Sequence, residues 1–560
     1  MAEINNRLLY GFIREESEYK QLFASIKTGF LQKPLPILVT GLCDGASDAL
    51  TVSVIGDVKR HRKEPALVVC PEEKECVRLC ELLNRAGLKS GFYNTRDYTF
   101  YNITASHEYE HERLKVLSEL LAGEMDVVLV TPDAALGYTI PPAKLIERMI
   151  RLQVGEEQEI SALLRRLSDA GYSRVELVDG AGQFAVRGGI LDIYPPYVKY
   201  RASGAAAEEA CAGGSFPVRI ELFGDEIDRI GAFDVESQRV NTNLSFVEFT
   251  PAREVLATPE NIETIRSAIA AHLKKSKDER AKEEMKEELA TIDALMQSEG
   301  SADLNFSDKY ITVIYPERNS LLDYFPDKTL LLIRGTAAVY ERLKSSEWHN
   351  GKTVEELLES GTIVSKYTDY CKPSSSFDLF TARNVTIHVD SLAQGMSGKK
   401  LSGLFNFRTR HMVPYVENFH LLCEDLGHYR TNGYRIILIA ENETAASNLS
   451  QMLTEADFPN QVIEKAITPN EIPKSSLSIF YGYTCKGYEL AASKTVILST
   501  VPELRSGGLS VSNKLKRRVK KKNSATQAIL SYSDLEIGDY VVHENYGIGQ
   551  YMGIENLAVG

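Results

Sequence analysis

The 560-residue sequence contains no Cys-x-x-Cys pair and no apolar run of the roughly 18 residues that a membrane span needs. Its eight cysteines are scattered, and Cys76 and Cys80, one helical turn apart, lack a second pair of ligands. A zinc site is therefore not expected, and reduced thiols are the default. The first ten residues lack the apolar core of a signal peptide. We expect a cytoplasmic protein without a metal centre or a membrane contact.

The sequence also lacks an excess of basic residues, because its formal net charge is −13. This charge argues against coating of nucleic acid by the whole surface. One local exception is 514–522, where seven of nine residues are Lys or Arg. Their mutual repulsion predicts an extended, flexible linker over 505–532. We favour a solvated linker over a DNA contact, which would be salt-sensitive and blind to sequence.

Apolar strands alternate with helices in the first part of the chain. Strands are expected at 36–39, 66–69 and 127–130, with helices at 49–60 and 72–86. This alternation predicts a parallel sheet. The hydrophobic content of 43% is ordinary for a globular protein, and the length predicts about three to five domains.

The first strand leads into Gly41, where a phosphate-binding loop would lie. A working loop reads Gly-x-x-x-x-Gly-Lys-Ser/Thr, so that backbone amides and a lysine meet the phosphates and a hydroxyl meets magnesium. Here Ala46, Ser47 and Asp48 stand at the glycine, lysine and hydroxyl positions. No apolar strand ends in Asp-Glu either, since the candidate at 330–333 is followed by arginine. We interpret the region as a RecA-like domain that has lost its nucleotide; the alternative is an α/β domain that never bound one.

The most informative stretch is 182–196, Gly-Gln-Phe-Ala-Val-Arg-Gly-Gly-Ile-Leu-Asp-Ile-Tyr-Pro-Pro. Apolar residues on both sides of Gly188-Gly189 predict two strands joined by a tight hairpin or bulge. Residues 219–223 and 227–230 alternate charged and apolar side chains, which predicts further strands. Periodicity alone indicates a small antiparallel sheet with ordinary surface charges.

Residues 182–239 resemble the UvrA-binding module shared by UvrB and the transcription-repair coupling factors. Phe-Ala-Val-Arg-Gly-Gly-Ile-Leu-Asp-Ile-Tyr-Pro and Arg-Ile-Glu-Leu-Phe-Gly-Asp-Glu-Ile-Asp carry the resemblance. It implies that Phe184, Arg187, Arg219 and Glu221 bind UvrA. Ala185 departs from UvrB, which has arginine there, so one ion pair of that contact is unaccounted for. A competing interpretation bonds Arg187 within its own hairpin.

Two further features separate the coupling factors from UvrB. Residues 101–113 leave no room for the long tyrosine-rich hairpin with which UvrB holds damaged DNA. Residues 538–554, Gly-Asp-Tyr-Val-Val-His-x-x-x-Gly-Ile-Gly-x-Tyr-x-Gly-Ile, resemble the opening of the CarD-type domain of the coupling factors. By this resemblance the partner is the RNA polymerase β subunit, and Leu557 lies at the interface. Short strands with glycines predict a small barrel, which we expect to be truncated at Gly560.

The predicted fold class is α/β multidomain. The expected order is a RecA-like domain, first part (1–150), an inserted antiparallel UvrA-binding module (151–250), the RecA-like domain, second part (251–350), a second α/β domain (377–504), the basic linker (505–532) and the truncated barrel (533–560). We expect a linker at 372–376, a strand at 321–333, a solvated charged face at 260–296 and a loop at 406–411. For the second α/β domain we expect strands at 385–388, 435–439, 478–480 and 495–498. We expect its helices at 416–430 and 444–455.

By resemblance, the chain is identified with the amino-terminal part of a transcription-repair coupling factor, which recruits UvrA to lesions where RNA polymerase has stalled. No catalytic residue and no bound ATP or magnesium is expected here. In the family these belong to a DNA-translocating motor, which would also make most of the DNA contact. The alternative is a UvrB-like ATP-dependent repair enzyme, against which the missing lysine and hairpin argue. A weaker third option is a CarD-like transcription regulator.

Overall fold

The computed structural model describes residues 7–96, 107–204, 211–274, 279–297, 310–359, 368–391, 400–415, 418–463, 469–482, 485–501, 540–543 and 547–550. The chain divides into two compact units, Met1–Glu503 and Leu504–Gly560. Among the described helices, none has both the length and the apolar character needed to cross a membrane.

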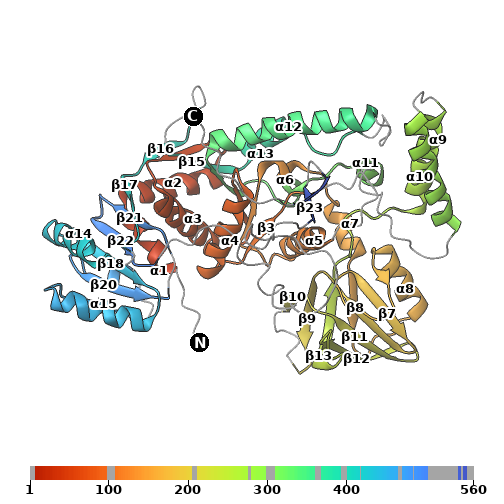
Figure 1. The fold of residues 1–560 in the computed structure, drawn as a ribbon, viewed down its shortest axis with the longest axis horizontal. Helices are drawn as coiled ribbons and strands as arrows, with labels where there is room; N and C mark the ends of the chain where they lie inside the picture. The colour runs from red at the N-terminus through yellow and green to blue at the C-terminus, as the bar shows by residue number, and fades with distance from the viewer. Residues whose placement is uncertain are drawn as a thin grey trace. The chain divides into compact units, whose positions relative to one another are not determined.

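Seven strands of the first unit pair in parallel (Figure 1). In sheet order they are β16 (Gly403–Asn406), β1 (Ile37–Thr40), β15 (Val385–Val389), β14 (Leu330–Arg334), β2 (Ala66–Val69), β4 (Val127–Val130) and β3 (Ser90–Tyr93). Alternate residues of β14 enter two different cores: Leu332 lies in one and Leu331 in the other. Both faces of the sheet are therefore covered, as parallel sheets require. The strands expected at 36–39, 66–69 and 127–130 and their parallel pairing are confirmed.

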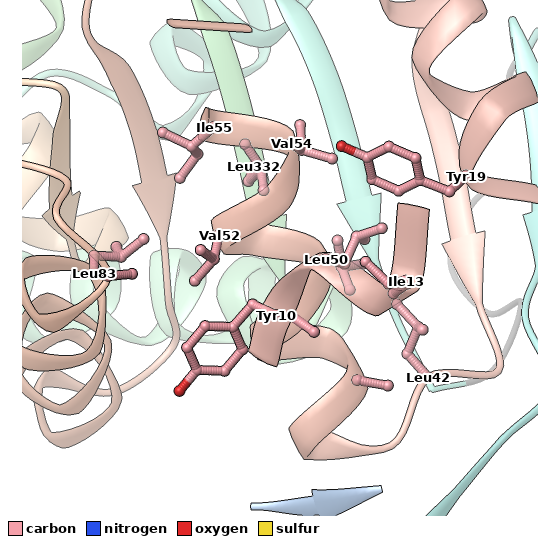
Figure 2. Packing of buried hydrophobic residues seen from close by; sticks show 14 of the residues in the cluster. Tyr10, Ile13, Tyr19, Leu42, Leu50, Val52, Val54, Ile55, Leu83 and Leu332 are labelled. Atoms are coloured by element: carbon pink, nitrogen blue, oxygen red, sulfur yellow. The ribbon is translucent and has the colours of Figure 1, made fainter. Parts of the chain in front are cut away.

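The first sheet is accompanied by helices from several parts of the chain. They are α1 (Arg7–Tyr10), η1 (Gly11–Glu15), α2 (Ser17–Leu31), α3 (Asp44–Lys59), α4 (Glu73–Arg85), α5 (Glu108–Leu121), α6 (Pro132–Leu136), α7 (Pro142–Arg148), α9 (Pro259–Leu273), α10 (Glu279–Gln297), α11 (Ile311–Ile314), η3 (Leu321–Tyr324), α12 (Thr336–Glu359) and α13 (Ser374–Arg383). Helix α3 is buried from Gly45 to Val58. In Figure 2, Leu50 and Val52 of α3 lie among the same buried residues as Tyr10 and Leu332. A helix buried on all sides is typical of a protein interior between layers.

A separate, mostly antiparallel sheet is inserted between α7 and α9 (the yellow strands of Figure 1). Its order is β10 (Ala212–Gly214), β9 (Val198–Ala202), β13 (Val240–Phe249), β12 (Glu226–Phe233), β11 (Val218–Phe223), β8 (Ile190–Tyr194), β7 (Gln183–Arg187) and β6 (Ser173–Arg174), with β5 (Ile150–Gln153) paired to β13. Helix α8 (Ile160–Asp169) buries Leu163 and Leu167 in the core of this module.

The hairpin predicted at Gly188-Gly189 is confirmed. Arg187 at the end of β7 pairs with Ile190 at the start of β8, so the turn contains two residues. Gly188 has φ of +62°, which disfavours any residue with a Cβ. A Cβ at Gly189 would lie 2.8 Å from the carbonyl oxygen of Leu222, so the turn lies close against the end of β11.

A six-stranded sheet follows in the first unit. Its order is β17 (Thr409–Met412), β21 (Gly487–Leu490), β22 (Thr495–Ser499), β18 (Arg435–Ala440), β20 (Leu477–Tyr481) and β19 (Gln461–Val462). Helices α14 (Phe419–Thr431) and α15 (Glu443–Glu455) pack against β18. Leu438 faces these helices, whereas Ile437 and Ile439 join the core that contains α3. The two α/β sheets therefore share one continuous core. The strands expected at 435–439, 478–480 and 495–498 are confirmed.

The expectation that residues 385–388 belong to the second α/β domain is wrong. They form β15, which pairs with β1 and β14 of the first sheet. An apolar run of five residues records that a strand is buried, but its sheet is decided by long-range pairing. The loop expected at 406–411 is also wrong, because β16 ends at Asn406 and β17 begins at Thr409.

The linker expected at 372–376 is wrong as well. The Lys372 N–H donates to the Leu136 carbonyl, its Nζ donates to Asp323, and α13 begins at Ser374. The strand expected at 321–333 is partly wrong, since η3 occupies its first four residues and β14 only its end.

Helices α9 and α10 lie side by side (Figure 1). The charged stretch was expected to be a solvated face, and ion pairs such as Arg266 with Asp293 agree with this. The helices also bury a set of apolar residues against the first α/β domain: Ile265, Ile269, Met285 and Ile292.

In the second unit, β23 (Tyr540–His543) and β24 (Gly547–Gln550) form an antiparallel pair in which Val541 lies opposite Gly549. The predictions for the linker at 505–532, for closure of the barrel and for Leu557 lie outside the described residues.

Candidate functional site

The loop between β1 and α3 joins a strand to a helix, as a phosphate-binding loop does. Gly41 follows the strand with φ of +76°, a conformation that glycine adopts most readily, and α3 begins at Asp44. Ala46, Ser47 and Asp48 lie in the first turns of α3 and are buried. The order of strand, turn and helix is present, whereas the phosphate-binding side chains are not.

The chain itself fills the space beside this loop. A side chain at Gly41 would collide with the carbonyl oxygen of Phe407. Thr409 Oγ1 accepts a hydrogen bond from the Cys43 N–H at 2.8 Å and donates one to the Gly41 carbonyl at 3.0 Å. The start of β17 therefore binds backbone groups that would surround a phosphate in a working loop.

Lys486, directly before β21 of the six-stranded sheet, lies over this loop. A Cβ at Gly45 would lie 2.7 Å from the Lys486 carbonyl oxygen, and Lys486 Nζ donates to Asp44 Oδ2 at 2.7 Å. The hydrogen bond from Lys486 holds the pKa of Asp44 below its usual value. The Lys486 ammonium is thus already paired with a carboxylate of the loop.

Asp48 takes part in a buried ion-pair network. The residue is 1% exposed and accepts two hydrogen bonds from Arg78, at 2.6 and 2.9 Å, and one from Arg334 at 3.1 Å. Arg334 ends β14 and also binds Glu75. In working loops a hydroxyl and a strand-end acid hold magnesium between them. Here an acid replaces the hydroxyl and an arginine ends the strand, so the two side chains bind each other.

In the described part of the chain, no group of three or more His, Cys, Asp or Glu side chains is arranged to hold a metal ion.

The inserted module between α7 and α9 holds the other predicted site residues. Phe184 is 2% exposed and lies in the module core, so its side chain supports the strands from within. Arg187 is exposed, and its Nη2 donates to the Glu176 carbonyl at 3.1 Å. The competing interpretation placed the bond of Arg187 within its own hairpin, whereas Glu176 lies before β7, outside that hairpin. One nitrogen therefore bonds elsewhere in the module while the side chain stays accessible.

Arg219 is bound on several sides. Its Nε and Nη2 donate to the two carboxylate oxygens of Asp192, at 2.6 and 2.8 Å, and its Nη1 donates to the Gln238 carbonyl at 3.1 Å. The guanidinium carbon lies 4.8 Å from the centre of the Phe233 ring. The hydrogen bonds that Arg219 donates to Asp192 raise the pKa of Arg219. Glu221, two residues along β11, lies 3.6 Å from Arg229 and is half-exposed.

Phe223 is a surface residue that the sequence prediction missed. It ends β11 and is 83% exposed, a rare state for a phenylalanine. Leu177 and Ile190 are also exposed apolar residues of this module. The sequence does contain a pattern that could have predicted this exposure. Phe223 follows Arg219 and Glu221 at the two-residue period of a strand and so shares their face.

These exposed residues gather at one end of the module. The Gly188-Gly189 turn contacts Leu222 at the end of β11, and Arg187 contacts the backbone next to Leu177. We call this set the tip surface: Leu177, Arg187, Ile190, Glu221 and Phe223. It combines apolar side chains with charges of both signs.

A buried charge cluster joins the module to the first sheet. Glu254, fully buried, binds Arg113 through two hydrogen bonds at 2.9 and 3.0 Å and also accepts from Thr139. Burial opposes ionisation of Glu254, but Arg113 holds its pKa below the usual value. His111 on α5 lies against Gly182 of the module, and burial lowers the pKa of His111 to about 4. The module is therefore anchored by charges shielded from water.

Comparisons with known proteins give matches for the inserted module and for the last residues of the sequence. Residues 150–255 match the family model of the UvrB interaction domain, and residues 535–560 match that of the CarD-like/TRCF RID domain. The chain is 28% identical over 559 residues to the transcription-repair-coupling factor of Bacillus subtilis (strain 168), covering 98% of this chain and 44% of that protein. It is 26% identical over 464 residues to the one from Staphylococcus epidermidis, covering 82% of this chain and 37% of that protein.

The chain thus spans less than half the length of these curated relatives. It is homologous to transcription-repair-coupling factors over 98% of its length, with a UvrB-type interaction domain and a segment similar to the CarD-like/TRCF RID domain.

Proposed function

We propose that this chain acts by binding other proteins in transcription-coupled DNA repair: its module at 150–255 binds UvrA, and its segment at 535–560 binds the RNA polymerase β subunit. The observation that carries the UvrA proposal is the tip surface, because it lies within the match to the UvrB interaction domain. An exposed aromatic side chain beside paired and unpaired charges is typical of a residue that anchors a protein interface.

Within the tip surface, the residues divide by role. Phe223 is the apolar anchor, and Arg187 and Glu221 supply charge. Phe184 lies outside this surface and supports β7 from the core. Charges at such an interface act mainly on partner choice and association rate, whereas a buried aromatic anchor controls the lifetime of the complex.

The first test uses purified UvrA and surface plasmon resonance. Phe223→Ala should weaken UvrA binding by at least about tenfold, because an interface anchor typically contributes about 2 kcal/mol or more. Arg187→Glu should lower the association rate, most strongly at low salt. Leu379→Ala is the matched control, since Leu379 is 71% exposed on α13, outside the module. Unchanged affinity for folded Phe223→Ala and Arg187→Glu proteins would contradict the proposal.

We also propose that the loop at 41–48 binds no nucleotide and that these residues are not an ATPase site. The lysine is missing, and Phe407, Thr409 and Lys486 surround the backbone that phosphates would need to approach. The same observations argue against the alternative, a UvrB-like enzyme that uses ATP through this loop.

The polymerase proposal rests on the match at 535–560 and on the resemblance that places Leu557 at the interface. Strand pairing between partners would supply main-chain hydrogen bonds, with side chains such as Leu557 supplying specificity.

A further inference from the structure

Asp192 is a buried carboxylate inside the module at 150–255 and is not part of the tip surface. It lies on β8 and is 2% exposed. In the strand register it stands directly opposite Arg219 of β11 on one side and Ala185 of β7 on the other. Because alanine carries no charge, Arg219 alone compensates Asp192 across these strands. A buried carboxylate is costly unless it is paired, so the pair is strongly held.

The pair fixes the orientation of Arg219. An arginine carries five N–H groups. Two bind Asp192, one binds the Gln238 carbonyl, and a second Nη2 N–H points to Gln238 Oε1 at 3.5 Å. The Phe233 ring covers the guanidinium as well. Among the described residues, one N–H of Nη1 is therefore left without an acceptor.

That remaining N–H belongs to a side chain at the accessible surface. The Arg219 side chain is 16% exposed and shares its strand face with Glu221 and Phe223. A partner that covers Phe223 and Glu221 would therefore approach Arg219 along the same face of β11. Since the arginine is already held in one rotamer, little side-chain entropy is lost when it binds.

We propose that Asp192 is a positioning residue for UvrA recognition: it holds the Arg219 guanidinium so that the free Nη1 N–H can donate to a carboxylate of UvrA. This inference rests on the proposed binding of UvrA by the tip surface. The arginine thus has two functions, one in the sheet and one at the interface, and Asp192 serves the second only through Arg219.

The first variant is Asp192→Asn in the whole chain. The amide keeps the shape of the carboxylate, but it loses the charge and one of the two acceptors facing Arg219. We expect UvrA affinity to fall by about tenfold, as it does when a charge pair at an interface loses a partner. A folded Asp192→Asn protein that binds UvrA like the unaltered chain would overturn the inference.

The second variant separates positioning from simple stability. Exchanging the pair, Asp192→Arg with Arg219→Asp, restores the cross-strand attraction but presents a carboxylate to UvrA. We expect the thermal midpoint to recover relative to Asp192→Asn while UvrA affinity stays at least about tenfold below that of the unaltered chain. Recovery of both quantities would show that Arg219 acts only in the sheet, and the inference would be wrong.

Arg219→Lys provides a check that needs no exchanged pair. Lysine keeps the charge and can bind Asp192, but it has no planar fork to orient a further N–H. We expect a thermal midpoint close to that of the unaltered chain and weaker UvrA binding; undiminished binding would overturn the inference.

Phe223→Ala is measured in parallel. If Phe223→Ala and Arg187→Glu also bind UvrA normally, the proposed function fails. If Phe223→Ala loses binding while the Asp192 and Arg219 variants keep it, only the role of Asp192 and Arg219 fails.

Discussion

Arg219 lies on an accessible face of β11, yet most of its N–H groups bind its own module. From the sequence alone, reversing Arg219 and Glu221 together is a natural test of UvrA binding. The structure shows that this variant would place two carboxylates side by side at Asp192, so it would disturb the sheet before it reported on UvrA. Glu221 contacts Arg229 at the surface and can be reversed without that cost.

Arg334 is the residue on which the buried network beside α3 depends. Arg334→Met should lower the free energy of unfolding of the first unit by about 3 kcal/mol, because Asp48 and Glu75 each lose a buried or partly buried partner. The check is the midpoint of urea unfolding followed by circular dichroism. Arg60→Met is the control, since Arg60 pairs with Asp57 at an exposed position and should change stability by less than about 1 kcal/mol. Equal effects for the two variants would contradict a role for the network.

His111 is expected to make the stability of the contact between the module and the first α/β domain depend on pH. Burial lowers the pKa of His111 to about 4, against about 6.5 in an unfolded chain. Between these values the unfolded chain binds the proton more strongly, so the His111 contribution is complete above about pH 6.5 and is lost as the pH falls towards 4. Three charged or titratable neighbours also act on His111: Glu110 raises its pKa, whereas His107 and Arg253 lower it.

The corresponding measurement is the thermal midpoint from pH 7.5 to 4.5 for the unaltered chain and for His111→Asn. The asparagine variant should lose less stability over this range than the unaltered chain. Parallel curves for the two proteins would show that His111 does not contribute.

At the scale of elements, the loop before α3 joins a strand to a helix without the lysine of a phosphate-binding loop, and we expect it to bind no nucleotide. Titration calorimetry with ATP and magnesium should detect no binding in the micromolar range. Ser47→Lys, which restores the lysine, should also bind no ATP, because Phe407 and Lys486 still occupy the approach to the backbone. Micromolar binding by Ser47→Lys would show that only the lysine is missing and that the covering strands move aside.

Element types were largely predictable, and their partners were not. The buried runs at 66–69 and 127–130 and the turn at Gly188-Gly189 follow from local patterns of apolar residues and glycine. The membership of β15 in the first sheet does not, because a buried strand is apolar on both faces whichever sheet it joins. The short edge strand β17 was missed since its residues, Thr-Arg-His-Met, carry no apolar alternation.

At the scale of the whole molecule, the proposed partners bind at separate units of the chain. The polymerase proposal is tested with Leu557→Arg, which should weaken binding of the β subunit by about tenfold if this leucine is an interface anchor. Leu379→Arg makes the same change at an exposed leucine of α13 and should leave binding unaltered. The measurement is co-precipitation of each variant with purified β subunit. Equal binding by the Leu557→Arg and Leu379→Arg variants would refute the role of Leu557.

The sequence by itself determined the parallel α/β character, the hairpin of the interaction module and the loss of the phosphate-binding lysine, because periodicity, turn residues and missing charges are local properties. Tertiary structure alone decided what covers the loop at Gly41, which residues of the module remain exposed, and that Asp48 and Asp192 each bind an arginine from another strand or helix. Those outcomes depend on pairs of residues up to several hundred positions apart in the chain. Such pairs lower the energy only after the chain has folded, so no local pattern records them.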